Sequence, residues 1–169
     1  MNKPELRTFF GKKRAVLSSQ EIKDKSSSIC EKVVSSHEWQ NAKVVILYES
    51  IGQEVQTIRL LLEAMSSDKI MATTGKKENN YALISYPDLK ELHSSISPDL
   101  IILPAVSCAK DGSRLGRGGG YYDKLLARFP DAFTIALVYE SQLSDCLPLE
   151  AHDKKVKMVV TENNVYISS

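Results

Sequence analysis

The chain has 169 residues, of which 43% are hydrophobic and 25% are charged. This length and composition exclude a disordered chain and predict one globular domain over residues 1–169. The formal net charge is only +1, which excludes the strongly basic surface that collects nucleic acid.

The start of the chain is polar and charged, and no run reaches the ~18 apolar residues of a membrane span. We therefore expect no membrane partner and a cytoplasmic location. Cys30, Cys108 and Cys146 are odd in number and widely spaced, which argues against a disulfide framework or a zinc site. Cys108 has no patterned base partner, so we expect a buried filler rather than a nucleophile.

The first two predicted elements are helices. Residues 3–16 predict a short basic helix. Ser18 and Glu21 form a capping-box pattern, in which a serine and a glutamate three residues later satisfy the free amides of a first turn. The second helix starts there and is expected to end near Trp39.

Residues 43–49 (KVVILYE) form a continuous apolar, β-branched run, which is typical of a strand buried on both faces of a parallel sheet. Further strands are expected at 69–74, 81–86, 99–103, 132–139 and 156–161, and further helices at 57–65 and 121–129. This alternation predicts an α/β fold with an open, mostly parallel sheet and helices on both faces.

The segment 114–123 (RLGRGGGYYD) holds four of the eight glycines between a buried strand and a helix. In open α/β sheets ligands bind beyond the carboxyl ends of the strands, and glycine-rich turns at helix starts bind anions through their amides. Arg114 and Arg117 add forked donors suited to phosphate oxygens. Asp123 offers the hard oxygen ligand that Mg²⁺ prefers.

Two common nucleotide motifs are absent. No G-x-x-x-x-G-K-[ST] string occurs, and the dinucleotide pattern G-x-G-x-x-G fails because Tyr121 stands where the last glycine belongs. The segment is therefore a phosphate-binding loop of another kind. The alternative is a surface turn in which Asp123 only interacts with the helix dipole.

The same segment resembles the 5-formyltetrahydrofolate cyclo-ligase family, also called methenyltetrahydrofolate synthetases, which carries R-L-G-x-G-[KG]-G-Y-Y-D after a strand that ends in proline. Other family-like pieces cover most of the chain. They are Lys3–Arg7, Arg14–Ser18, Ser50–Thr57, Pro148–Asp153 and Thr161–Glu162.

The resemblance implies ATP- and Mg²⁺-dependent cyclisation of 5-formyltetrahydrofolate to 5,10-methenyltetrahydrofolate by a monomer or weak homodimer. It implies Arg117 and Tyr121 as catalytic residues and Asp123 and Asp153 as Mg²⁺ ligands. The residues implied to bind ATP are Lys3, Arg7, Arg114, Gly116, Arg117, Gly118, Gly119, Gly120, Tyr121 and Tyr122. Those implied to bind the folate are Glu54, Arg117, Gly118, Gly119, Gly120 and Tyr121.

The implied chemistry suits such a site. A formamide oxygen is a poor leaving group until a phosphoryl group is transferred to it, after which N10 can attack and phosphate departs. Phosphoryl transfer needs positioning and charge neutralisation more than a covalent nucleophile.

Two features depart from the family pattern. Residues 75–98 are shorter than the corresponding family stretch and lack an extended substrate loop, and Lys157 stands where an acid is frequent. Two alternatives follow: a non-catalytic nucleotide- or folate-binding module, and a related ATP-using enzyme with a different small substrate. Without the resemblance, Lys3 and Arg7 would be interpreted as solvated charges on a terminal helix and Glu54 as an ordinary loop acid.

Overall fold

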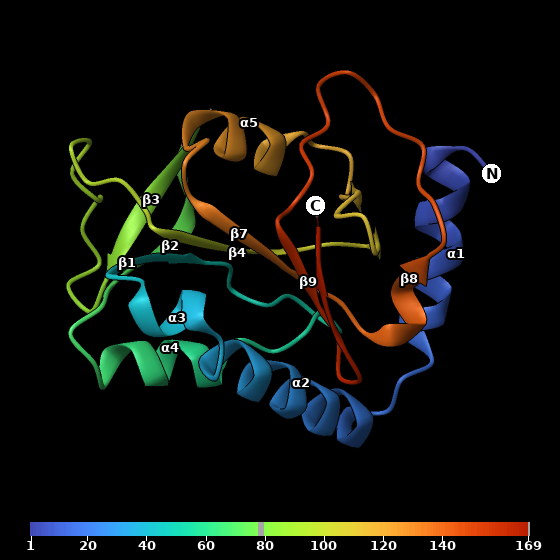
Figure 1. Cartoon of the computed structure of the whole chain (residues 1–169), viewed down its shortest axis with the longest axis horizontal. Coiled ribbons are helices and arrows are strands. Elements are labelled where there is room, and N and C mark those ends of the chain that lie inside the picture. Colours follow the sequence, from blue (N-terminus) through green and yellow to red (C-terminus); the bar gives the residue numbers. More distant parts are fainter. Residues whose placement is uncertain (78–79, 169) are drawn as a thin grey trace.

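The structure is a computed structural model that describes residues 1–77 and 80–168, and the side chains of residues 75–82 lie outside that description. Within the described residues the main sheet has seven strands in the order β10-β9-β7-β4-β1-β2-β3 (Figure 1). The strands are β1 (Val44–Leu47), β2 (Ile70–Lys77), β3 (Asn80–Tyr86), β4 (Leu100–Pro104), β7 (Phe133–Leu137), β9 (Met158–Val160) and β10 (Val165–Ile167).

The five inner strands β9, β7, β4, β1 and β2 are parallel to one another. The two edge strands, β10 and β3, run antiparallel to their neighbours. The prediction of an open, mostly parallel sheet is confirmed. The expected strand at 81–86 is present as β3. Part of the short segment 75–98 therefore belongs to β2 and β3, which pair antiparallel. Residues 78–79, between these strands, lie outside the described residues.

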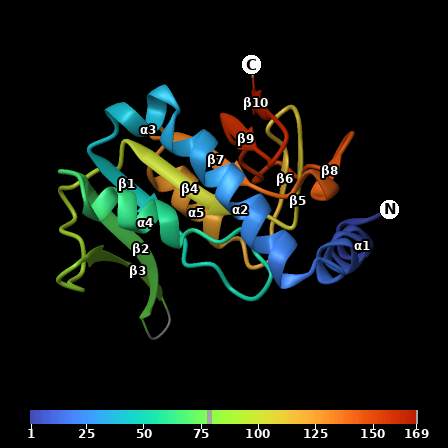
Figure 2. The same cartoon turned by 90° about the horizontal axis from the view of Figure 1, so that it is seen from below.

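Helices cover both faces of the sheet, as predicted. The helices α2 (Ser19–Val34), α3 (His37–Asn41) and α4 (Ile58–Met65) lie on one face, and α5 (Tyr121–Arg128) lies on the other (Figures 1 and 2). The N-terminal helix α1 (Lys3–Ala15) stands beside the sheet, next to β8 (Leu143–Ser144). Among the described residues, no helix has the length and apolar content needed to cross a membrane.

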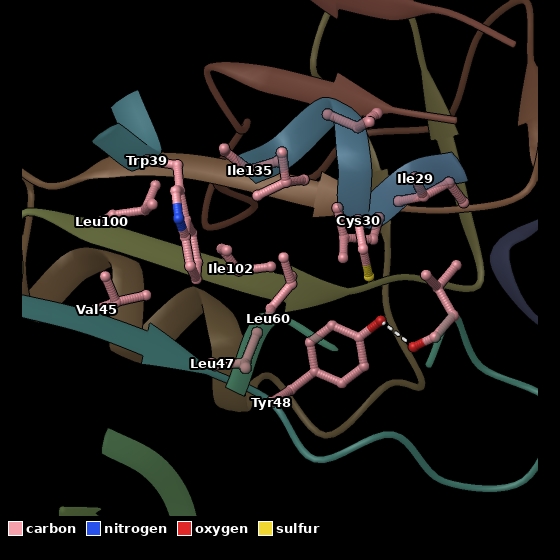
Figure 3. Close-up of a cluster of buried hydrophobic side chains, with 14 of the residues drawn as sticks. Ile29, Cys30, Trp39, Val45, Leu47, Tyr48, Leu60, Leu100, Ile102 and Ile135 are labelled. Carbon is pink, nitrogen blue, oxygen red and sulfur yellow. Dashed lines mark hydrogen bonds between the residues drawn. The ribbon is translucent and has the colours of Figure 1, made fainter. Parts of the chain in front are cut away.

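Alternation along the central strands explains the continuous apolar runs. Val45 and Leu47 point to the cluster under α2–α4, whereas Ile46 points to the cluster under α5. Successive strand side chains face opposite sides of a sheet, so a strand covered on both faces needs apolar residues throughout. Figure 3 shows the first cluster, with Trp39 and Leu60 from the helices against the strand residues.

The helix starts follow the sequence signals. Ser18 accepts from the backbone of Glu21, whose carboxylate accepts from the backbone of Ser18, so the predicted capping box is confirmed. The helix expected to end near Trp39 ends earlier, at Val34. Ser36 caps a new short helix there by accepting from the backbone N–H of Trp39 at 3.2 Å, because a serine hydroxyl at this point competes with continuation of the helix.

A three-stranded second sheet, β6-β5-β8, was not predicted. It contains β5 (Ser107–Ala109) and β6 (Arg114–Leu115), which are too short to show a period in sequence. The 3-10 helix η1 (Glu140–Gln142) leads from β7 toward β8. Because Arg114 lies in β6, the first residue of the predicted loop is held in a strand.

Candidate functional site

A cavity of about 740 Å³ opens beyond the carboxyl ends of β1 and β4. Its walls come from α1, the segments after β1 and β4, the glycine loop between β6 and α5, and residues 150–153. All of the site residues predicted from sequence line it. They are Lys3, Arg7, Glu54, Arg114, Gly116, Arg117, Gly118, Gly119, Gly120, Tyr121, Tyr122, Asp123 and Asp153.

The glycine loop depends on glycine at two positions. Gly118 has a φ of 101° and Gly120 a φ of 63°, a region that favours glycine. A Cβ on Gly118 would lie 3.3 Å from the guanidinium carbon of Arg7. The Nε of Arg7 also donates to the carbonyl of Gly116 at 2.8 Å, so α1 closes against this loop.

Gly120 is the N-cap of α5 and provides no side-chain cap. The first turn of this helix therefore presents backbone amides that no capping side chain satisfies, next to a loop that approaches Arg7 closely. Such a helix start favours an anion.

Arg114 is buried, with 3% of its side chain exposed, and its guanidinium donates to Oδ1 of Asp123 at 2.6 Å. Asp123 Oδ1 also accepts from the backbone N–H of Lys154 at 3.1 Å. Among the described residues, Arg114 Nε has no hydrogen-bond partner. An unpaired buried donor is costly, so an anionic ligand that reached this nitrogen would remove an unfavourable contribution to the free energy.

Arg117 and Glu54 form the second ion pair of the cavity. The guanidinium lies 2.7 Å from Oε1 of the carboxylate, and Oε2 accepts from the backbone of Ile51 at 3.0 Å. Glu54 has 6% of its side chain exposed, whereas Arg117 has 57%. The arginine is thus the partner that can move toward a ligand.

Lys3 and Asp153 form the third pair, with 2.6 Å between Nζ and Oδ2. Burial lowers the pKa of Lys3, but the hydrogen bonds and charges of Asp153 and Glu150 outweigh this effect and raise the pKa overall. Burial raises the pKa of the Asp153 carboxyl, but hydrogen bonds from Lys3 and from the Glu150 backbone outweigh burial, so that its pKa is lowered overall. The helix α1 is thereby tied to the segment 150–153.

Potential metal-ligand atoms of Glu150, His152 and Asp153 lie within 4.8 Å of one another. The sequence had singled out Asp153 with Asp123, but the structure groups Asp153 with Glu150, which lies three residues earlier. Carboxylate oxygens suit a hard cation such as Mg²⁺, whereas imidazole does not. Lys157 is not among the described residues that line the cavity, and its Nζ donates to the carbonyl of Ala132.

The model of the 5-formyltetrahydrofolate cyclo-ligase family matches residues 1–97 and 74–162. The chain belongs to this family. A cyclo-ligase from Mus musculus is 28% identical over 188 aligned residues, which cover 94% of this chain and 93% of that protein. A solved structure of the 5,10-methenyltetrahydrofolate synthetase from Aquifex aeolicus has a TM-score of 0.86 and 30% identity, covering 99% of this chain and 93% of that one.

The short 75–98 segment also fits a chain length found in a relative. The cyclo-ligase from Mycoplasma pneumoniae is 27% identical over 164 aligned residues, which cover 96% of this chain and 99% of that protein. A member of the cyclo-ligase family therefore has about the length of this chain, and the short segment does not set it apart from the family.

Several cavity residues were not singled out from sequence, although they directly follow β1. They are Tyr48, Glu49, Ser50 and Ile51. Burial raises the pKa of Tyr48, and its hydroxyl donates to the carbonyl of Val55 at 2.7 Å (Figure 3). The available signal was their position after a buried parallel strand, where α/β folds place ligands.

Proposed function

We propose that this cyclo-ligase family member, as a single α/β domain, catalyses ATP- and Mg²⁺-dependent closure of 5-formyltetrahydrofolate to 5,10-methenyltetrahydrofolate. The observation that carries the proposal is the cavity. It gathers cationic side chains, a glycine loop at a helix start and several carboxylates beyond the carboxyl edge of a parallel sheet. Membership of the family supports the same reaction.

The ATP phosphates are proposed to lie along the glycine loop. Arg114 Nε, buried and without a partner among the described residues, supplies one donor, and the first turn of α5 supplies further amides. Arg117 adds positive charge from the same loop, and Lys3 and Arg7 add it from α1 on the facing wall. Charge neutralisation and alignment are the main requirements of phosphoryl transfer. Arg117 and Tyr121 are proposed to act closest to the reacting groups.

The folate is proposed to occupy the wall formed by Glu54 and the residues after β1. In the reaction the formyl oxygen attacks the γ-phosphorus and ADP leaves. Nitrogen N10 then attacks the activated formyl carbon, N10 loses its proton and phosphate departs with the former formyl oxygen. The glycine loop contacts the folate wall through the ion pair of Arg117 with Glu54, which suits the residues at positions 117–121 to align the two substrates.

Mg²⁺ is proposed to be held by Asp123 and Asp153. Oδ1 of Asp123 is used by Arg114 and Lys154, whereas none of the described residues hydrogen-bonds to its Oδ2. Glu150 is available beside Asp153. A divalent ion held there would neutralise the negative charge that develops on the phosphate oxygens.

A cytoplasmic location and a monomeric or weakly dimeric state remain proposals. Cys30, Cys108 and Cys146 are free thiols, and two of them are buried. Free thiols are typical of a reducing compartment. Burial raises the pKa of Cys108 to about 12, which suits a structural residue and not a nucleophile.

The test follows the absorbance of the methenyl product with purified protein, 5-formyltetrahydrofolate, ATP and Mg²⁺. Omission of ATP, or addition of EDTA, should abolish the signal. Asp123→Asn and Arg117→Ala should each lower kcat/KM by about 10²-fold or more, the order seen when a charge-stabilising donor is removed. The matched control is Arg128→Ala, since Arg128 is exposed at the far end of α5. ATP binding without turnover would instead indicate a binding module.

A further inference from the structure

Glu49 lies two residues beyond the end of β1 and lines the cavity. Its Oε1 accepts from the hydroxyl of Tyr86 at 2.6 Å and from the hydroxyl of Thr73 at 3.1 Å. These donors come from β3 and β2, so two neighbouring strands hold an exposed carboxylate in one orientation. Both donors are neutral, and the negative charge of Glu49 is left uncompensated by them.

The other carboxylates among the described residues that line this cavity have cationic partners. Arg117 pairs with Glu54, Arg114 with Asp123, and Lys3 with Glu150 and Asp153. Among the residues whose side chains the structure describes, no cation forms an ion pair with Glu49, and its Oε2 accepts no hydrogen bond. A carboxylate oxygen can accept two donors, so Oε2 has room for two N–H groups of a ligand.

A ligand group that binds this carboxylate must donate hydrogen bonds, because the carboxylate oxygens only accept them. Phosphates and the formyl oxygen are acceptors and would be repelled by this carboxylate. The amino edge of adenine offers a single amino group between ring acceptors. The 2-aminopyrimidin-4-one edge of a pterin instead presents N3–H and 2-NH₂ side by side, a pair that can converge on one carboxylate oxygen.

We propose that Glu49 binds the N3–H and 2-amino edge of the substrate pterin and acts as a specificity-determining residue. This inference rests on the proposed function. Tyr86 is then a positioning residue. Its hydrogen bond to Glu49 raises the pKa of Tyr86, which keeps the hydroxyl protonated as a donor at neutral pH.

The test compares Glu49→Gln and Glu49→Ala with wild type in the full chain. We expect KM for 5-formyltetrahydrofolate to rise at least tenfold while KM for ATP stays within twofold. Tyr86→Phe should raise the folate KM less, because the carboxylate remains but loses one fixing bond. The control is Glu31→Gln, an exposed acid on α2.

A 2-desamino analogue of 5-formyltetrahydrofolate gives a second readout. If Glu49 recognises the 2-amino group, the difference between wild type and Glu49→Gln shrinks with this analogue. An unchanged folate KM in both Glu49 variants, or an equal rise in KM for ATP, would overturn the inference. Calorimetric titration of the folate into the same variants separates the two claims. Absent wild-type turnover counts against the proposed reaction, whereas unchanged folate affinity in the variants counts against Glu49.

Discussion

Three of the four cations proposed to meet a phosphate, Lys3, Arg114 and Arg117, already hold a carboxylate in this structure. Arg117 is paired with Glu54, and Arg114 is paired with Asp123. A nucleotide that draws Arg117 toward its phosphates would release the Glu54 carboxylate for the folate. The two substrates should therefore assist each other's binding, because each removes a contact that competes with the other.

We expect a non-hydrolysable ATP analogue with Mg²⁺ to tighten folate binding by about 5- to 150-fold, the usual range of coupling between sites. Arg117→Ala should remove most of this coupling, while Arg128→Ala should keep it. The measurement is calorimetric titration of the folate with and without the analogue. If the wild type bound the folate equally well with and without the analogue, the idea that the nucleotide releases Glu54 from Arg117 would be wrong.

The ion pair of Asp111 with Lys155 makes the stability of the fold depend on pH in acid. Hydrogen bonds from Lys155 and Ser113 lower the pKa of Asp111 from its ordinary value of 3.8 to about 2. A lowered folded-state pKa gives stability that is present above about pH 4 and is lost as the pH falls toward 2. Asp111→Asn should reduce the unfolding free energy at pH 7 by at most about 1 kcal/mol, since the pair is exposed.

The check for Asp111 is urea unfolding of wild type and variant at pH 7 and pH 2. The difference between them should be larger at pH 7 and should shrink at pH 2, where the wild-type carboxyl is about half protonated. Exposed Asp24→Asn is the control. A difference that stays constant over this range would show that the contacts of Asp111 do not depend on its charge.

At the scale of elements, α1 is held by a small cluster of its own. Leu6 and Phe10 pack on Val106, Ala109, Leu115 and Leu147, separately from the two clusters of the sheet. The same helix carries Lys3 and Arg7 to the cavity. A helix that rests on few apolar contacts opens with a smaller free-energy cost than the central sheet. Because α1 also carries cavity residues, we expect its local opening to weaken nucleotide binding.

We therefore expect Leu6→Ala to loosen α1 locally. Amide exchange should speed up in α1 while the strands β1 and β4 stay protected, and KM for ATP should rise severalfold. Leu60→Ala, which empties a fully buried site under the sheet, should instead cost about 2–5 kcal/mol and speed up exchange throughout. If Leu6→Ala exposed the sheet as strongly as Leu60→Ala, the separation of the two clusters would be wrong.

The elements themselves were predictable to different degrees. The central strand 43–49 was predicted because both of its faces are apolar. The antiparallel direction of β3 was not predicted, because direction depends on which strand lies alongside. The strands β5, β6 and β8 were missed because two or three residues show no period. The end of α2 at Val34 was missed because a capping serine at Ser36 outweighed the apolar Trp39 beyond it.

For the whole molecule, the ligand should stabilise the fold by mass action. At 100 times Kd, MgATP contributes about 2.7 kcal/mol. For a chain of this size each kcal/mol raises Tm by roughly 2–4 °C, so the expected rise is about 5–10 °C in a thermal melt. Arg114→Ala should abolish the rise, and EDTA should reduce it. An equal rise in that variant would place the nucleotide elsewhere.

Local properties of the sequence determined the helix caps, the doubly buried strands and the glycine loop, since each depends on residues close together in the chain. Positive φ at Gly118 and Gly120 is such a property. Tertiary structure alone decided the pairing of charges. The contacts of Glu49 with Tyr86 and of Arg117 with Glu54 join residues far apart in sequence. Such pairings depend on how strands and loops pack together, and no short pattern in one sequence specifies that packing.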